Sequence, residues 1–476
     1  MERKDTKERS FYFQRLRCFS MKQQMALEIL KGGKNVFLTG SAGSGKTHTL
    51  NTYIHFLRSQ GADVAVTAST GIASTHLGGR TIHSWAGIGI RDYITPAQAR
   101  EIISHKRLRK RFTKINTLII DEISMIDARV LNMVDCMLRE GRRKPLEPFG
   151  GIQIVVCGDF FQLPPVISSK KKTKISLFSQ GDESVFAYTA KSWEEACFSV
   201  CYLDEQYRHT KGDFFDILNA IRSGRGEEDA RFQLESLVGR ELDHSEDITH
   251  LYTHNFDVDR INETRLRMIS ASSKRYRMKS LGRAPLVASL KQSCLAHEEF
   301  IVKKGASVMF VKNDFEGKYV NGTLGIVTGF DADQFPVVTT REGRKIVARP
   351  QAWQLEEDDD VLAEIRQIPL RLAWAITVHK SQGMTLDAAK MDLSRSFVAG
   401  MGYVALSRVR SLEGLELLGV NKEALCVHPD VLEQDKEFFK DSQEEVSRWK
   451  GISLETKKEK ELAFASNFFG KKEEDV

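Results

Sequence analysis

Short apolar runs separated by helical or polar segments fill the first third of the chain. Each run is rich in β-branched residues and too short for a helix, which is the pattern of a strand buried on both faces. A Gly-rich turn after the first run opens a helical stretch that ends at Gly61. This alternation predicts an α/β fold, a parallel sheet with covering helices. The runs are NVFLTG (35–40), DVAVTAST (63–70), TLIIDE (117–122) and IQIVVCGD (152–159).

A second strand-rich stretch runs from Ala306 to Val347. Its apolar segments, ASVMFVKN, GTLGIVTGF, FPVVTT and RKIVAR, are separated by Gly, Asn and Asp turns. That spacing predicts a small β-barrel inserted in the second half of the chain.

Charged segments interrupt this pattern in three places. Residues 94–114 have a helical pattern and end in HKRLRKRFTK, which places this segment on the surface. The lysine-rich run SSKKKTK (168–174) has nothing to bury and predicts a surface loop. The tail after about Ser442 is charged and predicts a helix followed by disorder.

Composition places the chain among soluble globular proteins. Its 476 residues predict two or more domains, and 41% hydrophobic with 28% charged residues is ordinary for a folded protein. The net charge of +6 favours an anionic partner only weakly. No apolar stretch is long enough for a signal peptide or a membrane span, and acidic residues near the N-terminus argue against a mitochondrial presequence. Seven scattered cysteines without a CxxC pair favour a reducing compartment and no structural metal.

A phosphate-binding motif follows the first strand. The run GSAGSGKT fits the P-loop pattern GxxxxGK[ST], with the required strand before it and helix after it. Its glycines let backbone N–H groups face a β-phosphate, Lys46 would reach the β- and γ-phosphates, and Thr47 would hold Mg²⁺. The candidate nucleotide-binding residues here are Gly40, Ser41, Ala42, Gly43, Ser44, Gly45, Lys46, Thr47 and His48, with ATP and Mg²⁺ as cofactors.

A carboxylate pair follows the third apolar run. Asp121 and Glu122 stand where a Walker B pair belongs, with Asp121 on Mg²⁺ and Glu122 polarising the attacking water. Alone, such a pair would more often be the charged start of a helix. The P-loop upstream favours the catalytic interpretation.

Further motifs resemble one helicase family. DEISMID, PFGGIQ and GDFFQLPPV, then VTASTGIAS, GRTIHSWAGIG, LDEQYR, WAITVHKSQGMTLD and YVALSRVRS, are similar to segments of the petite-integration-frequency (Pif) helicases, the 5′-to-3′ branch of superfamily one related to RecD and Dda. The resemblance covers residues 19–420, although FSMKQQ (19–24) departs from the family's usual L-S-x-E-Q. It implies two RecA-like P-loop domains in tandem, with a small wedge insertion in the first and an SH3-like β-barrel in the second.

The resemblance also implies domain bounds and ATPase roles. The bounds are an N-terminal tail (1–18), a first motor domain (19–195) with its wedge at about 86–114, a second motor domain (196–304 and 361–425), the barrel (305–360) and a C-terminal helix or tail (426–476). Gln23 would read adenine, Gln162 would sense the γ-phosphate, and Arg208 and Arg408 would approach it from the second domain, where a guanidinium stabilises the charge of the transferring phosphoryl group. Unaided sequence would make Arg208 an ordinary surface ion pair. Gln382 and Gly383 in HKSQG would couple the nucleotide to the DNA.

Small polar residues in the same motifs are the candidate DNA contacts. Hydroxyl groups and free backbone N–H groups suit phosphate contacts that form and break at each step. For each of them the alternative is a helix cap or a turn, and for His83 a core histidine. The candidates are Ser69, Thr70, Gly71, Thr81, His83, Thr253, Asn255, Asn321, Gly322, His379 and Ser381.

Three functions compete at this point. The first is an ATP-dependent 5′-to-3′ DNA helicase that is monomeric off DNA, acts on single strands, junctions, R-loops or G-quadruplexes, and serves replication, repair or recombination. The others are an ATP-gated single-strand binding switch, and an ATPase acting on a protein, which leaves HKSQG unexplained. The basic run HKRLRKRF is either a duplex contact or a solvated helix face. The tail sequence ASNFFGKK is either a hook for a replication or repair protein or an amphipathic cap on the motor, and the expected compartment is the cytoplasm or the nucleus.

Overall fold

The chain folds into two compact units. The computed structural model describes residues 20–69, 80–89, 91–165, 186–207, 212–242, 249–253, 255–294, 296–312, 314, 317–319, 321–340, 343–357, 360–378, 381–382, 386 and 388–469. The first unit comprises the described parts of Met1–Ser69, Thr81–Thr210 and His428–Val476. The second comprises those of Thr70–Arg80 and Lys211–Val427.

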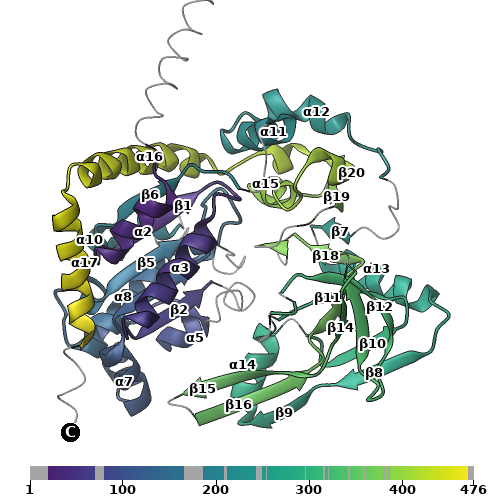
Figure 1. The fold of residues 1–476 in the computed structure, drawn as a ribbon, viewed down its shortest axis with the longest axis horizontal. Helices are drawn as coiled ribbons and strands as arrows, with labels where there is room; N and C mark the ends of the chain where they lie inside the picture. The colour runs from purple at the N-terminus through teal and green to yellow at the C-terminus, as the bar shows by residue number, and fades with distance from the viewer. Residues whose placement is uncertain are drawn as a thin grey trace, which may run out of the picture. The chain divides into compact units, whose positions relative to one another are not determined.

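A parallel sheet forms the centre of the first unit, with helices beside it (Figure 1). The described strand order is β3-β2-β4-β5-β1-β6, and the pairs from β2 to β6 are parallel. The four apolar runs of the sequence form β1, β2, β4 and β5, as predicted. The strands are β1 (Val36–Gly40), β2 (Val64–Ala68), β3 (Arg80–Thr81), β4 (Thr117–Asp121), β5 (Gln153–Cys157) and β6 (Ser199–Leu203). The helices are α2 (Gln23–Lys31), α3 (Lys46–Ser59), α5 (Ile82–Ala86), α6 (Pro96–Ile103), α7 (Lys106–Lys114), α8 (Ala128–Arg142), α10 (Lys191–Ala196), α16 (Pro429–Lys450) and α17 (Leu454–Phe469).

The predicted helical segment 94–114 is two helices, α6 and α7. α6 begins at a capping box between Thr95 and Gln98, which satisfies the first backbone N–H groups of the helix. α7 buries Leu108 and Phe112 and exposes most of its basic side chains. The basic run therefore lies on a helix surface.

The second unit has its own parallel sheet, in the described order β18-β7-β19-β20. Its strands are β7 (Thr249–Tyr252), β18 (Ala375–Thr377), β19 (Ala389–Leu393) and β20 (Leu415–Val420). The helices of this unit are α11 (Asp213–Arg222), α12 (Arg231–Glu235), α13 (Asn255–Met268), α14 (Ala284–Ser293) and α15 (Met401–Leu406).

An antiparallel sheet stands where the barrel is predicted. The four predicted runs form β11 (Ser307–Phe310), β12 (Leu324–Phe330), β13 (Pro336–Thr340) and β14 (Lys345–Val347), around a core that includes Phe310 and Val338. The sheet also takes in β17 (Leu370–Leu372), beyond the expected limit of 360. The remaining strands are β8 (Ser273–Arg277), β10 (Glu299–Lys303), and a separate sheet of β9 (Lys279–Gly282), β15 (Gln351–Glu357) and β16 (Asp360–Gln367).

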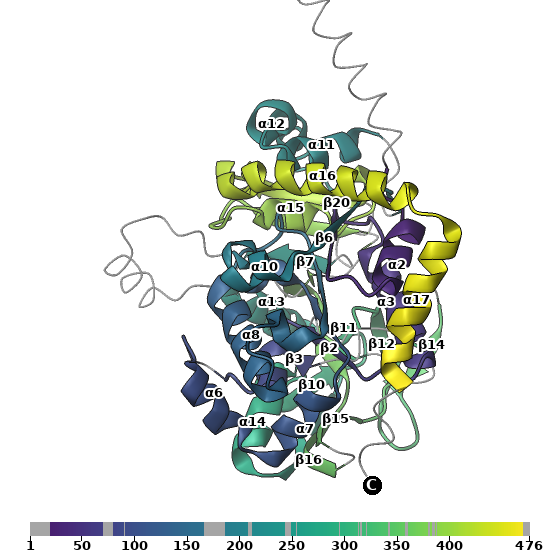
Figure 2. The same cartoon turned by 90° about the vertical axis from the view of Figure 1, so that its left-hand side faces the viewer.

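Two further bounds differ from those expected. β6 pairs with β1, so the first unit extends past the expected boundary at 195. The C-terminal segment forms α16 and α17, which belong to the first unit and lie beside α2 (Figure 2). β6 belongs to the first unit because its backbone pairs with β1. α16 and α17 belong there because their apolar side chains pack on that unit. None of the helices in the described part of the chain is long and apolar enough to cross a membrane.

Candidate functional site

The P-loop curls between β1 and α3. Gly45 has a left-handed backbone (φ 86°), and a Cβ at this position would collide with Nε2 of Gln23, so glycine is required. The Lys46 ammonium donates to the carbonyl oxygens of Gly40 (2.8 Å) and Ser41 (3.0 Å). These contacts fold the lysine back over the loop, where a phosphate would accept its hydrogen bonds.

The carboxylate pair lies at the carboxyl end of β4. Burial raises the pKa of Asp121, while the Glu122 backbone N–H (2.9 Å), the Cys157 thiol and the charge of Lys46 act in the opposite direction. Glu122 has a left-handed backbone (φ 52°, ψ 49°), a conformation that costs of order 1–3 kcal/mol in a non-glycine residue. Asp121 therefore lies close enough to Lys46 for their charges to interact, and the Mg²⁺-binding and water-polarising roles of the two acids stay predictions.

A second group of residues meets the P-loop from β6 and α2. The Gln23 side-chain amide donates to the Ser44 carbonyl oxygen (3.3 Å), and its backbone N–H donates to the Glu205 carboxylate (3.0 Å). Gln206 donates to the Ser41 hydroxyl, and the Tyr207 N–H donates to the Gly43 carbonyl oxygen (3.0 Å). Sequence reasoning singled out Gln23 but missed Gln206 and Tyr207. Their only signal was their place beside Arg208 in LDEQYR.

Several buried polar atoms around this loop lack a hydrogen-bond partner within the described residues. Two of them, the Ser44 hydroxyl and Oε1 of Gln206, belong to the loop and its neighbour. The hydroxyls of Ser69 and Ser124 follow β2 and β4, at the sheet edge where ligands bind in α/β folds. Unpaired buried polar atoms are costly, so a site that gathers them is built for a polar ligand. The Thr47 and Asp121 oxygens are the donors Mg²⁺ prefers, so the residues fit a magnesium-bound nucleotide.

The other ATPase candidates occupy different places. Gln162 is buried beyond β5 in the first unit. Arg408 is 2% exposed in the second unit, where its guanidinium donates to the Val404 carbonyl oxygen (2.8 Å) and the Ser407 hydroxyl (2.8 Å). Nη1 of Arg408 also reaches the carbonyl oxygen of Ser381 (3.5 Å), next to the buried Gln382. Arg208 and Gly383 lie outside the described residues.

The candidate DNA contacts are a mixed set. The Thr81 side chain caps α5 by accepting the Ser84 N–H (3.4 Å), which is the alternative weighed for this residue. Ser381 is fully buried and its hydroxyl donates to the Val378 carbonyl oxygen (2.8 Å), so this side chain is already used within the fold. Ser69 and His83 are partly exposed, Thr253 and Asn321 are buried, and the Gly322 N–H donates to the Phe310 carbonyl oxygen (2.8 Å). Thr70, Gly71, His379 and the side chain of Asn255 lie outside the described residues.

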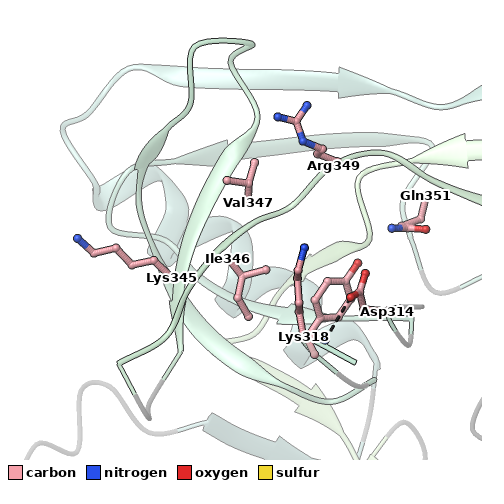
Figure 3. Close-up of a pocket in the computed structure, with 8 residues that line it drawn as sticks. Asp314, Lys318, Lys345, Ile346, Val347, Arg349 and Gln351 are labelled. Atoms are coloured by element: carbon pink, nitrogen blue, oxygen red, sulfur yellow. Dashed lines mark hydrogen bonds between the residues drawn. The ribbon is translucent and has the colours of Figure 1, made fainter. Parts of the chain in front are cut away.

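A cavity of about 510 Å³ opens in the barrel region, near the Asn321–Gly322 turn in sequence (Figure 3). Arg349 pairs with Asp331 (3.3 Å) and Asp333 (3.2 Å), so its charge is compensated. The lining also contains Lys318 and Lys345 but only one carboxylate, that of Asp314. This excess of positive charge suits an anionic group. The lining residues are Asp314, Lys318, Tyr319, Lys345, Ile346, Val347, Arg349 and Gln351.

The six cysteines in the described part of the chain are free. Among the same described residues, no group of three or more His, Cys, Asp or Glu side chains is placed to hold a metal ion by itself.

The chain is similar in sequence and in structure to known proteins of one family. A model of the PIF1-like helicases matches residues 19–231. The ATP-dependent DNA helicase Pif1 of Psychrobacter sp. is 41% identical over 93% of this chain and 74% of its own length. The crystal structure of Bacteroides Pif1 with ADP-AlF4 matches with a TM-score of 0.75 at 32% identity, over 88% of this chain and 97% of that one. Bacteroides Pif1 bound to single-stranded DNA matches with a TM-score of 0.66 at 33% identity, over 89% of this chain and 97% of that one.

These neighbours confirm the expected tandem RecA-like α/β fold. Since a relative above 40% identity covers most of both chains, the resemblance seen in the motifs is one of descent. The chain belongs to the PIF1-like helicase family and is an ATP-hydrolysing DNA helicase.

Proposed function

We propose that this helicase translocates 5′-to-3′ on single-stranded DNA and opens duplexes, forks, R-loops or G-quadruplexes during replication, repair, recombination or telomere maintenance. The observation that carries the motor assignment is the P-loop site, where Lys46, Asp121 and the strained Glu122 gather beside unpaired buried polar atoms. The polarity and the single-strand substrate are supported by the family and by the single-stranded DNA bound to Bacteroides Pif1.

The residues divide the work of phosphoryl transfer between them. Lys46 binds the β- and γ-phosphates, and Glu122 orients the attacking water. Thr47 and Asp121 would hold Mg²⁺, which neutralises charge on the phosphate oxygens when bound. Gln162 senses the γ-phosphate, and Arg208 and Arg408 stabilise the charge of the transition state, a contribution of about 10³ or more in rate.

Strand contacts would come from both units and from the barrel. His83 remains a partly exposed side-chain candidate of the first unit, the Ser69 residue is partly exposed although its hydroxyl is buried, and the buried Ser381 would act through its backbone. The lysine-bearing cavity of the barrel region would add an anion-binding subsite for a strand phosphate.

Strand displacement on two matched duplexes tests the proposal, one with a 5′ single-stranded tail and one with a 3′ tail. We expect ATP-dependent opening of the 5′-tailed duplex alone, and no opening by Lys46→Ala. Opening of the 3′-tailed duplex would contradict the polarity. Turnover of ATP on single strands without opening of either duplex would favour the ATP-gated binding switch.

A further inference from the structure

The C-terminal helices hold the two elements that lead into the P-loop. α16 packs along β6 and α17 packs against α2 (Figure 2). β6 continues into Gln206 and Tyr207, and α2 begins with Gln23. Each of these three residues hydrogen-bonds the loop from outside it. The tail that looked peripheral in sequence thus contacts the supports of the nucleotide site.

α16 completes the edge of the sheet. β6 is the last strand of the described order, so its outward N–H groups need other partners. The Tyr202 N–H donates to the Ser442 hydroxyl (3.1 Å), and Ser442 is 4% exposed. The Tyr202 hydroxyl also bonds Asp435 (3.1 Å), and its ring meets Phe439 edge-on at 5.5 Å. The strand that delivers Gln206 is therefore bonded to β1 on one side and to α16 on the other.

Residues at the end of α16 and in α17 contact the C-terminal end of α2 and the turn that follows it. Trp449 is buried and its indole N–H donates to Glu28 (3.1 Å), which also pairs with Lys457 (3.5 Å). A Cβ on Gly33 would lie 2.5 Å from Cδ2 of Phe464, so only glycine lets that ring pack here.

An ion pair ties the same region to α16. Glu445 is 1% exposed and pairs with the partly exposed Lys34 (2.6 Å), two residues before β1, and with Arg448 of its own helix (3.6 Å). A carboxylate buried this deeply needs cationic partners, so the contact with Lys34 favours one register of α16 on the sheet. Together these contacts leave α2 and β6 little freedom to shift.

We propose that α16 and α17 are a positioning element of the ATPase site, which keeps Gln23 and Gln206 on the P-loop. This role rests on the proposed assignment of that loop as the ATP site. Close-packed interiors transmit displacement, and the nine residues of α2 span only about 13 Å, so movement at Glu28 reaches Gln23. Phe468, in the segment weighed as either a partner hook or a cap on the motor, is buried, which favours the cap.

Two substitutions test the role with little change of volume. Ser442→Ala removes the acceptor of the Tyr202 N–H, and Trp449→Phe removes the donor to Glu28 while keeping a ring. We expect each to raise the KM for ATP about three- to tenfold, the range for one buried hydrogen bond, with kcat within about twofold of the parent. Ser447→Ala is the matched control, because that exposed hydroxyl bonds only the Gln443 carbonyl oxygen of its own helix.

DNA-stimulated ATPase assays and thermal unfolding are measured on the same full-length samples. A lower melting temperature with unchanged KM in both variants would overturn the positioning role, and so would an equal rise of KM in Ser447→Ala. Tyr202→Phe, which loses only the bond to Asp435, replaces Ser442→Ala if that variant does not fold. Lys46→Ala is run in parallel: turnover that survives this change overturns the ATP-site assignment and the positioning role with it, whereas its loss leaves the KM comparison as the deciding result.

Discussion

At the residue scale, two candidate catalytic cations are hydrogen-bonded to their own neighbours. Lys46 and Arg408 both donate to backbone carbonyl oxygens in the described structure. An ammonium or guanidinium group forms a stronger hydrogen bond to a phosphate oxygen than to a neutral carbonyl oxygen, because both partners are then charged. Each resting contact is therefore one that a nucleotide would displace.

Arg408 gives a direct test at this scale. We expect Arg408→Ala to lower the kcat of DNA-stimulated ATP hydrolysis by about a thousandfold or more, with a smaller change in KM, because the guanidinium acts on transition-state charge. Arg408→Lys should not rescue the rate, since an ammonium lacks the planar fork. The exposed Arg410 nearby serves as control through Arg410→Ala. A kcat close to the parent value in Arg408→Ala would remove this residue from the catalytic set.

His250 makes the second unit sensitive to pH. Burial, followed by the charges of Lys390 and Arg265, lowers the pKa of His250 from 6.5 to about 4. The folded chain therefore binds the proton more weakly than the unfolded chain, and protonation favours unfolding as pH falls from about 6.5 towards about 4. We expect protection of β7 amides from hydrogen exchange to fall between about pH 7 and about pH 5 in the parent and less in His250→Gln. Equal losses in both proteins would assign the effect to other groups.

At the scale of elements, α7 carries a cluster of positive charge and contains no acidic residue. Its sequence KRLRKRFTK has six basic residues, and Leu108 and Phe112 alone face the core. A helix of this kind is a phosphate-binding surface or a solvated face, and sequence cannot separate these.

Salt dependence separates the two interpretations of α7. We expect a triple alanine variant at the exposed Lys106, Arg109 and Lys114 to bind forked DNA more weakly, with the slope of log K against log salt reduced by up to about 2.7, near 0.9 per lost phosphate contact. A triple alanine variant at the exposed Lys440 of α16 and Lys458 and Lys460 of α17 controls for the loss of three positive charges. An unchanged slope in the α7 variant would identify a solvated face.

At the scale of the whole molecule, two compact units are joined where the chain leaves the first after Thr210 and returns at His428. The P-loop site lies in the first unit, and Arg408, which we propose acts on the γ-phosphate, lies in the second. We therefore expect bound ADP and bound ADP-AlF4 to stabilise the two units to different extents.

Hydrogen exchange with bound nucleotide tests this division. We expect ADP with Mg²⁺ to protect the first unit by about 2.7 kcal/mol at a hundredfold excess over Kd, with little change in the second, because a ligand stabilises only the fold it binds. ADP-AlF4, which mimics the transferring phosphoryl group, should protect Arg408 and its neighbours as well. Lys46→Ala should abolish both effects. Equal protection of both units by ADP would contradict the assignment of Arg408 to the γ-phosphate.

The sequence by itself determined four strands of the first sheet (β1, β2, β4 and β5), the P-loop, the Walker B pair and four strands of the barrel region (β11, β12, β13 and β14). These features are local: a short β-branched run, a glycine that needs positive φ, or a turn residue carries its own signal within a few positions. The family motifs added Gln23, Gln162 and Arg408, whose spacing along the chain predicts no contact.

Only the tertiary structure decided where distant segments meet. β6 joins the first sheet beyond the expected boundary, β17 joins the barrel sheet, and the charged tail becomes two helices packed on α2 and β6. Gln206 reaches Ser41 although the two residues are 165 positions apart in the chain. Such pairings depend on backbone hydrogen bonds and close packing between segments, and neither composition nor periodicity within one segment encodes its partner.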